Sequence, residues 1–324
     1  MSLIPWTEIT SFHNIKKYTG AYPEILNNKS LVTYKCKVKL HGTNAGIQVF
    51  SDGKIIAQSR ETELINGADN CGFAKWVDSH KEKWKQIATD DKEYIIYGEW
   101  CGKGVQKGVA ISEVPNKIFA VFAARLLNSN DSIIIEPNEL QDLVKNIPET
   151  YVLPWHHSTI YIDWTSNESQ LSTITNLINS LVLDVEQTDP WVEANFKIKG
   201  VGEGLVFYPV SEEHLSLKDF NNLVFKAKGE AHKNIKTGAP AQVNPQLASN
   251  VDGFVDMVLS EARLEQGANQ TYDIKLIGKF LAWIALDVQK ETKDELEASG
   301  LTWEQVNKAL TSKARIWYLG KSKI

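Results

Sequence analysis

Along the first two-thirds of the chain, apolar residues follow the two-residue period of strands in some segments and the longer period of helices in others. Segments rich in Val, Ile, Tyr and Phe and bounded by Gly, Asn or Asp are typical of strands. They are LVTYKCKVKL (31–40), AGIQVF (45–50), KIIAQSR (54–60), EYIIYGEW (93–100), KIFAVFAARL (117–126) and EGLVFYPV (203–210). NELQDLVKNI (138–147) and SQLSTITNLINSLVLDVEQ (169–187) carry apolar residues at helical spacing. The pattern predicts an α+β fold with antiparallel sheets.

The last quarter of the chain has a helical period throughout. The stretch before it, KGEAHKNIKTGAPAQVNP (228–245), has the Gly, Pro and Lys content of a linker. We therefore predict an α+β domain over residues 1–238 and a small all-α domain over residues 239–324. Capping and Pro signals predict three helices in the second domain. These run from Asn244-Pro245 to about Gly267, from about Tyr272 to Ala298, and onward from a capping box of Thr302 with Gln305.

Composition and charge limit the partners that the chain can bind. Its 324 residues, 43% hydrophobic and 23% charged, are typical of a soluble globular protein. Because the formal net charge is −5, a nucleic acid would have to bind at a local cluster of Lys and Arg. No apolar run is long enough to span a bilayer, and MSLIPWTEIT lacks the residue order of a secretory signal. We expect a cytoplasmic protein without a membrane partner.

The strand at 31–40 places lysines on one face and leads into the short motif KLHGTN (39–44). This alternation predicts a polar face that includes Lys35, Lys37 and Lys39. An ordinary solvated strand explains such a pattern. The alternative is a nucleophile, because a neutral lysine amine can attack phosphorus when nearby cations or burial lower its pKa. Lys226 and Lys228, on one face of a strand and roughly 7 Å apart, would supply those cations.

Five motifs in order resemble the superfamily of covalent nucleotidyltransferases, which contains ATP-dependent polynucleotide ligases and capping enzymes. They are KLHGTN, YGEW with Glu99, FAVF with Phe122, EGLVF with Glu203, and FKAK. The form K-x-H-G-x-N is similar to the phage-type RNA ligase 2 family, whereas DNA ligases and capping enzymes usually carry K-x-D-G. This resemblance implies an antiparallel-sheet nucleotidyltransferase domain of the ATP-grasp-like ligase type, followed by a helical domain that engages RNA.

The resemblance also implies residue roles. Lys39 would attack the α-phosphorus of ATP and form lysyl-AMP, from which AMP passes to an RNA 5′-phosphate before a 3′-hydroxyl displaces it. Mg²⁺ or Mn²⁺ would bind with Glu203 as its main protein ligand. The other expected nucleotide contacts are His41, Gly42 and Asn44 beside the phosphates, Arg60 at the ribose or RNA end, Glu99 at the ribose 2′-hydroxyl, Phe122 on the adenine, and Lys226 and Lys228 at the α-phosphate.

Two departures from the family pattern concern the base. Many relatives have an acidic residue before the nucleophile, where this chain has Val38, so adenine selectivity is open. The aromatic strand continues with Ala123 instead of Asp, so Phe119 is an alternative to Phe122 as the stacking residue. The C-terminal segment is basic and would bind RNA phosphate or form a solvated helix face. Its cations are Lys308, Lys313, Arg315, Lys321 and Lys323.

These observations predict an ATP-dependent RNA ligase that seals 5′-phosphate and 3′-hydroxyl RNA ends at nicks in duplex RNA. We expect a monomer that acts in the cytoplasm of a bacterial or phage-infected cell. Two alternatives stay open. One is a DNA ligase or a GTP-dependent capping enzyme, disfavoured by His41. The other is a non-catalytic RNA-binding protein, disfavoured because simple binding does not require the nucleophile with both carboxylates and both late lysines.

Overall fold

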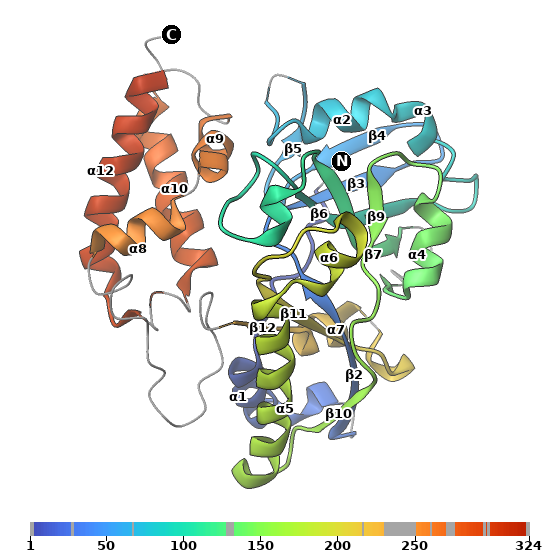
Figure 1. Ribbon diagram of the computed structural model, residues 1–324. Helices are drawn as coiled ribbons and strands as arrows, with labels where there is room; N and C mark the ends of the chain where they lie inside the picture. Colours follow the sequence, from blue (N-terminus) through green and yellow to red (C-terminus); the bar gives the residue numbers. More distant parts are fainter. Residues whose placement is uncertain are drawn as a thin grey trace.

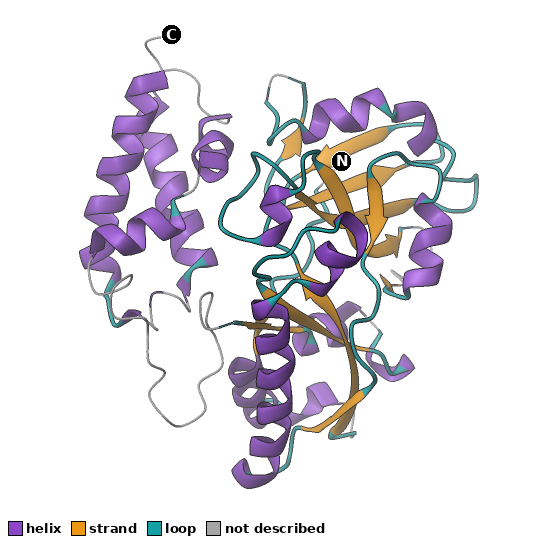
Figure 2. Cartoon of the chain, in the orientation of Figure 1, coloured by secondary structure: helices purple, strands orange, loops and turns teal. Residues whose placement is uncertain are grey.

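The computed structural model describes residues 3–26, 29–66, 68–127, 133–215, 217–229, 251–259, 261–269, 276–293, 296 and 299–321. Two sheets form the first part of the chain, and a group of helices lies beside them (Figures 1 and 2). Almost all strand pairs are antiparallel, the exceptions being two short pairs. The predicted α+β class with a helical C-terminal region is confirmed.

The first sheet contains the strand that ends at Lys39. Its order is β1 (Thr10–Ser11), β12 (Phe225–Lys228), β11 (Gly204–Pro209), β2 (Leu31–Lys39) and β10 (Ile160–Asp163). The second sheet has the order β5 (Glu63–Leu64), β4 (Ile55–Gln58), β3 (Thr43–Val49), β6 (Tyr94–Cys101), β7 (Ile118–Leu126) and β8 (Ile133–Ile134), and β9 (Thr150–Val152) pairs with β7. All six predicted strands are present.

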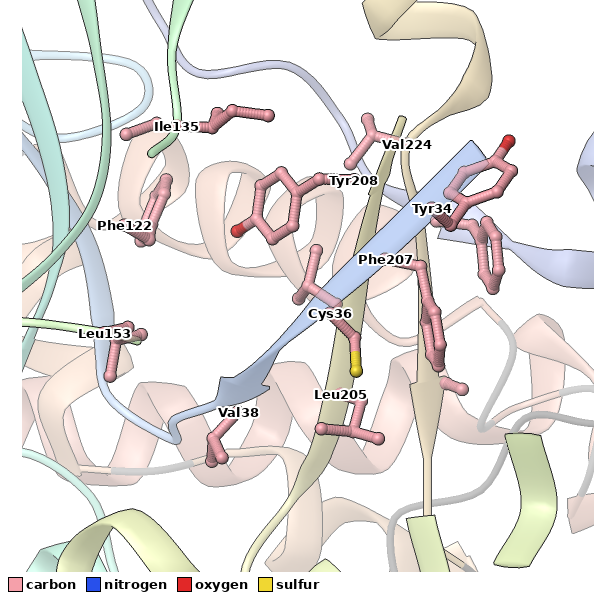
Figure 3. Close-up of a cluster of buried hydrophobic side chains, with 14 of the residues drawn as sticks. Tyr34, Cys36, Val38, Phe122, Ile135, Leu153, Leu205, Phe207, Tyr208 and Val224 are labelled. Carbon is pink, nitrogen blue, oxygen red and sulfur yellow. The ribbon is translucent and has the colours of Figure 1, made fainter. Parts of the chain in front are cut away.

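Two apolar cores hold these sheets. The larger core joins the first sheet to one face of the second, and the smaller core covers the other face of the second sheet. Figure 3 shows Phe122, Ile135 and Tyr208 on one side of β2 and Cys36, Leu205 and Phe207 on the other. Strand β2 is therefore packed on both faces, and the alternative of an ordinary solvated strand does not hold at Lys37, which has no exposed surface.

Helices cover the outer faces of both sheets. They are α1 (Phe12–Ala21), α2 (Phe73–Ser79), α3 (Lys81–Trp84), α4 (Pro137–Val144), α5 (Glu168–Gln187), α6 (Pro190–Phe196) and α7 (Leu217–Leu223), with short 3₁₀ turns at Pro23–Leu26, Ala110–Glu113 and Glu212–His214. The longest, α5, begins at a capping box in which Asn167 and Gln170 each accept from the other's backbone N–H. This helix packs against β11 and β12, behind the strands that carry Glu203 and the late lysines.

The C-terminal helices form a third core around Phe254, Phe280, Ile284 and Leu310. They are α8 (Val251–Val258), α9 (Glu261–Asn269), α10 (Ile277–Glu291) and α12 (Trp303–Lys321). The capping contact of the last helix is confirmed, because Thr302 N donates to Gln305 Oε1 over 2.8 Å. No helix among the described residues is long and apolar enough to cross a membrane.

Two of the predicted helices are each interrupted. The helix expected to end near Gly267 is split into α8 and α9, and its predicted start at Asn244-Pro245 lies outside the described residues, as does the domain boundary at residue 238. The helix expected to reach Ala298 ends at Glu291. At Thr292 the hydroxyl donates to Val288 O over 2.7 Å, a side-chain bond of the kind that competes with helix continuation.

Candidate active site

A cavity of about 910 Å³ opens beside the end of β2. Strands of both sheets line it, together with residues of α8, α9, α10 and α12. All ten residues that the sequence singled out line this one cavity. They are Lys39, His41, Gly42, Asn44, Arg60, Glu99, Phe122, Glu203, Lys226 and Lys228. The structure thus brings together residues that lie up to 189 positions apart in the chain, from 39 to 228.

Lys39 and the late lysines come together through strand pairing. Strand β11 runs antiparallel between β2 and β12, with Gly204 opposite both Lys39 and Lys228. Lys39 and Lys228 therefore lie on either side of Gly204, which has no side chain. Their amines both reach the carboxylate of Glu203. Gly204 has a φ of 147°, and a Cβ there would lie 2.8 Å from the Lys228 Cα, so a larger residue would not fit without a shift.

Glu203 is the anion at the centre of this group. Its Oε2 lies 2.7 Å from Lys39 Nζ, its Oε1 lies 3.5 Å from Lys228 Nζ, and its Oε2 lies 3.6 Å from His41 Nδ1. The side chain of Glu203 is only 4% exposed. Burial alone would raise its pKa, but Lys39, Lys228 and His41 together hold the pKa well below its usual value. The carboxylate is therefore ionised and is a suitable ligand for a hard cation.

Glu99 of β6 is hydrogen-bonded to the turn at Gly42, which follows the nucleophile candidate. Gly42 N donates to Glu99 Oε1 over 3.0 Å, and a Cβ at Gly42 would lie 2.9 Å from the Glu99 Cγ. Asn44 lies directly opposite Glu99 in the β3–β6 ladder. Burial, and to a smaller extent the charge of Glu203, raises the pKa of Glu99 to about 7 despite the nearby Lys39. One carboxylate of the site is ionised and the other titrates near neutral pH.

Phe122 lines the cavity and lies at a β-bulge of β7. The register between β6 and β7 shifts between Tyr97 and Gly98, which pair with Ala123 and Val121 and leave Phe122 as the extra residue. The ring of Phe122 lies 5.3 Å from that of Trp6, which also lines the cavity. The alternative, Phe119, packs in the smaller core with Phe73 on the opposite face of the sheet.

Arg60 enters the cavity from the end of β4 and pairs with a residue that sequence reasoning missed. Its Nη1 donates to Glu291 Oε1 at the end of α10. Nearby, Lys290 Nζ lies 3.6 Å from Glu61 Oε1. Burial alone would raise the pKa of Glu291, but Arg60 and Lys226 hold it below its usual value. These two ion pairs connect the helical region to the rim of the cavity.

Lys37 is a second residue that sequence reasoning missed. It lies on β2 two residues before Lys39, and its amine donates to Phe122 O over 2.8 Å and to Ile135 O over 2.7 Å. The amine also lies 4.7 Å from the Trp155 ring centroid. The alternating pattern does not distinguish Lys37 from Lys39, because only the pairing of distant segments buries one and leaves the other at the cavity. Lys37 fixes the backbone of the bulge relative to β2.

The basic residues of α12 are partly neutralised. Lys313 pairs with Asp256 of α8, and Lys321 Nζ lies 2.7 Å from Glu265 Oε1 and 3.5 Å from Glu261 Oε1 of α9. On the apolar face of α12, Val306, Leu310 and Ala314 are buried and Trp317 is partly buried, whereas Lys323 lies outside the described residues. The role of this basic segment in RNA binding stays a prediction.

Comparison with known proteins gives one family and one group of structures. The family model described as RNA ligase matches residues 33–228. The structure of a Naegleria gruberi RNA ligase K326A mutant with ATP and Mn is 20% identical, with a TM-score of 0.47, and the match covers 71% of this chain and 56% of that one. The same enzyme with PPi is 19% identical, with a TM-score of 0.46 and coverages of 71% and 57%.

This chain therefore spans little more than half of the length of those Naegleria proteins. No curated protein sequence gives a significant match. The family match extends from the third residue of β2 to the last residue of β12 and contains every candidate site residue. Because the matched segment is more than half of the 324 residues, the chain belongs to the RNA ligase family.

Proposed function

We propose that this protein is an ATP-dependent RNA ligase that joins a 5′-phosphate to a 3′-hydroxyl at nicks in duplex RNA. The observation that carries the proposal is the group around Lys39 at the end of β2. Its amine and that of Lys228 both contact the Glu203 carboxylate, and all three residues line one large cavity. Membership of the RNA ligase family supports RNA as the substrate.

In the proposed first step, the Lys39 amine attacks the α-phosphorus of ATP. A phosphorus–nitrogen bond forms, the bond to the bridging oxygen breaks, and pyrophosphate leaves. Lys39 must lose a proton to act as the nucleophile. Its amine lies 2.7 Å from Glu203 Oε2, so we expect phosphate binding to separate Lys39 from Glu203 before attack.

The remaining residues position the nucleotide. Phosphoryl transfer depends mainly on alignment and on neutralising phosphate charge, which Lys226 and Lys228 would supply from β12. Phe122 would stack on the base, and Glu99 would accept a hydrogen bond from the ribose. His41 and Asn44 would complete the phosphate side, and Arg60 would contact ribose or RNA after exchanging its bond to Glu291.

The residues present fit a divalent cation that is shared with phosphate. No group of three or more His, Cys, Asp or Glu that could hold a metal exists among the described residues. Mg²⁺ commonly takes one or two carboxylates plus phosphate oxygens and waters, which suits the ionised carboxylate of Glu203 beside Lys39. Bound with ATP, Mg²⁺ or Mn²⁺ would supply neutralisation of the developing phosphate charge.

The second and third steps would use the same cavity. AMP would pass from Lys39 to the RNA 5′-phosphate, which forms a phosphoanhydride and frees the amine. The RNA 3′-hydroxyl would then attack the 5′-phosphorus and release AMP. A monomer is sufficient for this scheme, because all ten proposed site residues come from one chain.

The test is a sealing assay with 5′-labelled strands. We expect a nick in duplex RNA to be sealed in the presence of ATP and Mg²⁺, with a slower reaction on the matching DNA nick and on unannealed RNA. Lys39→Ala should leave all strands unjoined. Equal sealing of DNA and RNA would contradict the RNA assignment, and sealing with GTP alone would favour the capping branch of the superfamily. Binding of duplex RNA without joining would favour the non-catalytic alternative.

A further inference from the structure

The cavity beside Lys39 has a polar end and an apolar end, and one hydroxyl group lies at the apolar end. Phe122, Leu153, Val206 and Tyr208 line this end. Tyr208 is 2% exposed, and its hydroxyl has no hydrogen-bond partner among the residues that the structure describes. In Figure 3 the hydroxyl points toward the side of β2 where Phe122 and Leu153 lie. Because Tyr208 lines the cavity, a ligand in the cavity can pair with this hydroxyl.

The strand that carries Tyr208 also sets its distance from the nucleophile. Gly204, Val206 and Tyr208 alternate on one face of β11, and Gly204 lies opposite Lys39. Four residues of strand separate Gly204 from Tyr208, which is roughly 13 Å at the usual rise per residue. A nucleotide whose α-phosphate lies at Lys39 would extend along this face and bring the far edge of its base toward Tyr208.

The usual position for a base-reading side chain is apolar in this chain. Val38 precedes the nucleophile, and Figure 3 shows its side chain with Leu205, on the other side of β2 from Phe122. It is 5% exposed and belongs to the larger core. Val38 also lines the cavity, but its side chain can neither donate nor accept a hydrogen bond.

We propose that Tyr208 binds the hydrogen-bonding edge of the adenine ring while Phe122 stacks on the face of the ring. This role rests on the function proposed above. A tyrosine hydroxyl can accept from the exocyclic amino group and can donate to the adjacent ring nitrogen. Purine recognition would thus come from β11 instead of from the residue before the nucleophile.

The surroundings of Tyr208 hold its ring in place and keep its hydroxyl protonated. Its ring lies 5.9 Å from that of Trp155, 6.2 Å from that of Phe220, and 5.6 Å from the Lys37 amine. Burial, with a smaller effect of the Glu99 charge, raises the pKa of Tyr208 above its ordinary value. The hydroxyl proton is therefore available to a base at any pH at which the enzyme would work.

The experiment measures nucleotide binding on a background that cannot transfer AMP. In Lys39→Ala protein, calorimetry gives Kd for ATP, for 1-deaza-ATP, which lacks the ring nitrogen, and for purine riboside triphosphate, which lacks the amino group. We add Tyr208→Phe, which keeps the ring. As a matched control we add Tyr161→Phe, because Tyr161 is a tyrosine of β10 in the same sheet that is 57% exposed. Thermal melts confirm that each variant is folded.

We expect Tyr208→Phe to weaken ATP binding by roughly 3- to 10-fold, the effect of one net hydrogen bond. For at least one of the two analogues, Tyr208→Phe should leave the Kd nearly unchanged. That analogue already lacks the atom that Tyr208 contacts. Tyr161→Phe should change no Kd.

Two results would overturn the role of Tyr208. One is an equal loss for all three nucleotides, which would place its hydroxyl away from the base edge, and the other is no loss for ATP. Failure of the proposed function is distinguishable, because it would show as an absence of lysyl-AMP in the wild-type protein. If the Kd values follow the predicted pattern but the wild-type protein forms no lysyl-AMP, Tyr208 contacts the base and the protein is not a ligase. No ATP binding at all would reject both.

Discussion

At the scale of single residues, Lys37 shows how a buried charge can support a site without touching its ligand. Its amine donates to two backbone oxygens, those of Phe122 and Ile135. A neutral amine keeps two N–H groups, so both bonds survive deprotonation. Burial lowers the pKa of Lys37 to about 7, and the charge of Glu136 offsets part of this effect. Lys37 therefore joins β2 to the bulge of β7 in either protonation state.

The lowered pKa of Lys37 predicts a pH dependence of stability. Between pH 7 and its unfolded-state pKa of about 10.4, the unfolded chain binds the proton of Lys37 more strongly than the native protein does. The contribution of Lys37 to the free energy of unfolding should therefore rise as pH rises above 7. Urea denaturation of wild type and Lys37→Met at pH 7 and pH 9 measures it, and the difference between the two proteins should grow in favour of wild type.

Lys35→Met is the matched control for this measurement. Lys35 lies two residues earlier on the same face of β2 but is 31% exposed and pairs with Glu136 over 3.5 Å. Its substitution should produce little change with pH. A difference between wild type and Lys37→Met that stays constant or shrinks over this range would contradict the lowered pKa.

Glu99 leads to a prediction about the ribose. If its carboxylate accepts from the 2′-hydroxyl, Glu99→Gln should raise the KM for ATP in lysyl-AMP formation by roughly 10-fold, as expected for a hydrogen bond to a charged group. With 2′-deoxy-ATP the same substitution should have little effect, because the donor is absent. Because the pKa of Glu99 is raised to about 7, the 2′-hydroxyl preference of wild type should weaken as pH falls below 7. An equal effect of the substitution on both nucleotides would contradict the contact.

At the scale of elements, alternation and turn residues were sufficient to predict the six strands, and helical spacing predicted α4 and α5. The bulge was not predictable, because the extra residue at Phe122 arises from the pairing of β6 with β7 and has no local signal. The helix breaks after Val258 and Glu291 were missed for a related reason. Tertiary packing and the Thr292 hydroxyl outweigh a continuous helical pattern there.

The pairing of β11 with its two neighbours gives a prediction at this scale. Gly204→Ala would place a methyl group against the Ala227 backbone at a φ of 147°. We expect a loss of about 1–3 kcal/mol in the free energy of unfolding, as is usual for a strained backbone conformation, and weaker nucleotide binding because β12 must shift. Gly20→Ala is the control, because Gly20 has open space around it in α1 and the change should be neutral or stabilising. Urea denaturation that finds the two variants equally stable would contradict this account.

At the scale of the whole molecule, ion pairs connect the C-terminal helices to the rim of the cavity. Arg60 and Glu291 are 231 positions apart, and Glu61 pairs with Lys290 beside them. Such partners cannot be identified from local sequence, although Arg60 itself was. The helical region lies beside the sheets (Figure 1), and its residues complete the lining of the cavity.

These contacts predict how the molecule responds to salt. Replacing both Lys290 and Glu291 by Ala should increase the radius of gyration in small-angle scattering at low salt, because the pairs that hold the helical region against the cavity are lost. High salt should produce part of the same change in wild type by screening the partly exposed pairs. Glu304→Ala in the first turn of α12 is a control that should have no effect. An unchanged radius in the double variant would show that apolar packing holds the two parts together.

Formation of lysyl-AMP is tested most directly by labelling the protein with ATP that carries a radioactive α-phosphate, in the presence of Mg²⁺ or Mn²⁺. We expect label to stay on the wild-type chain in a denaturing gel, to be released by acid as expected for a phosphorus–nitrogen bond, and to be absent from Lys39→Ala. Lys35→Ala, on the same strand, should label normally. Absence of label on folded wild-type protein that mass spectrometry shows to be free of AMP, or persistence of label on Lys39→Ala, would contradict lysyl-AMP formation at Lys39.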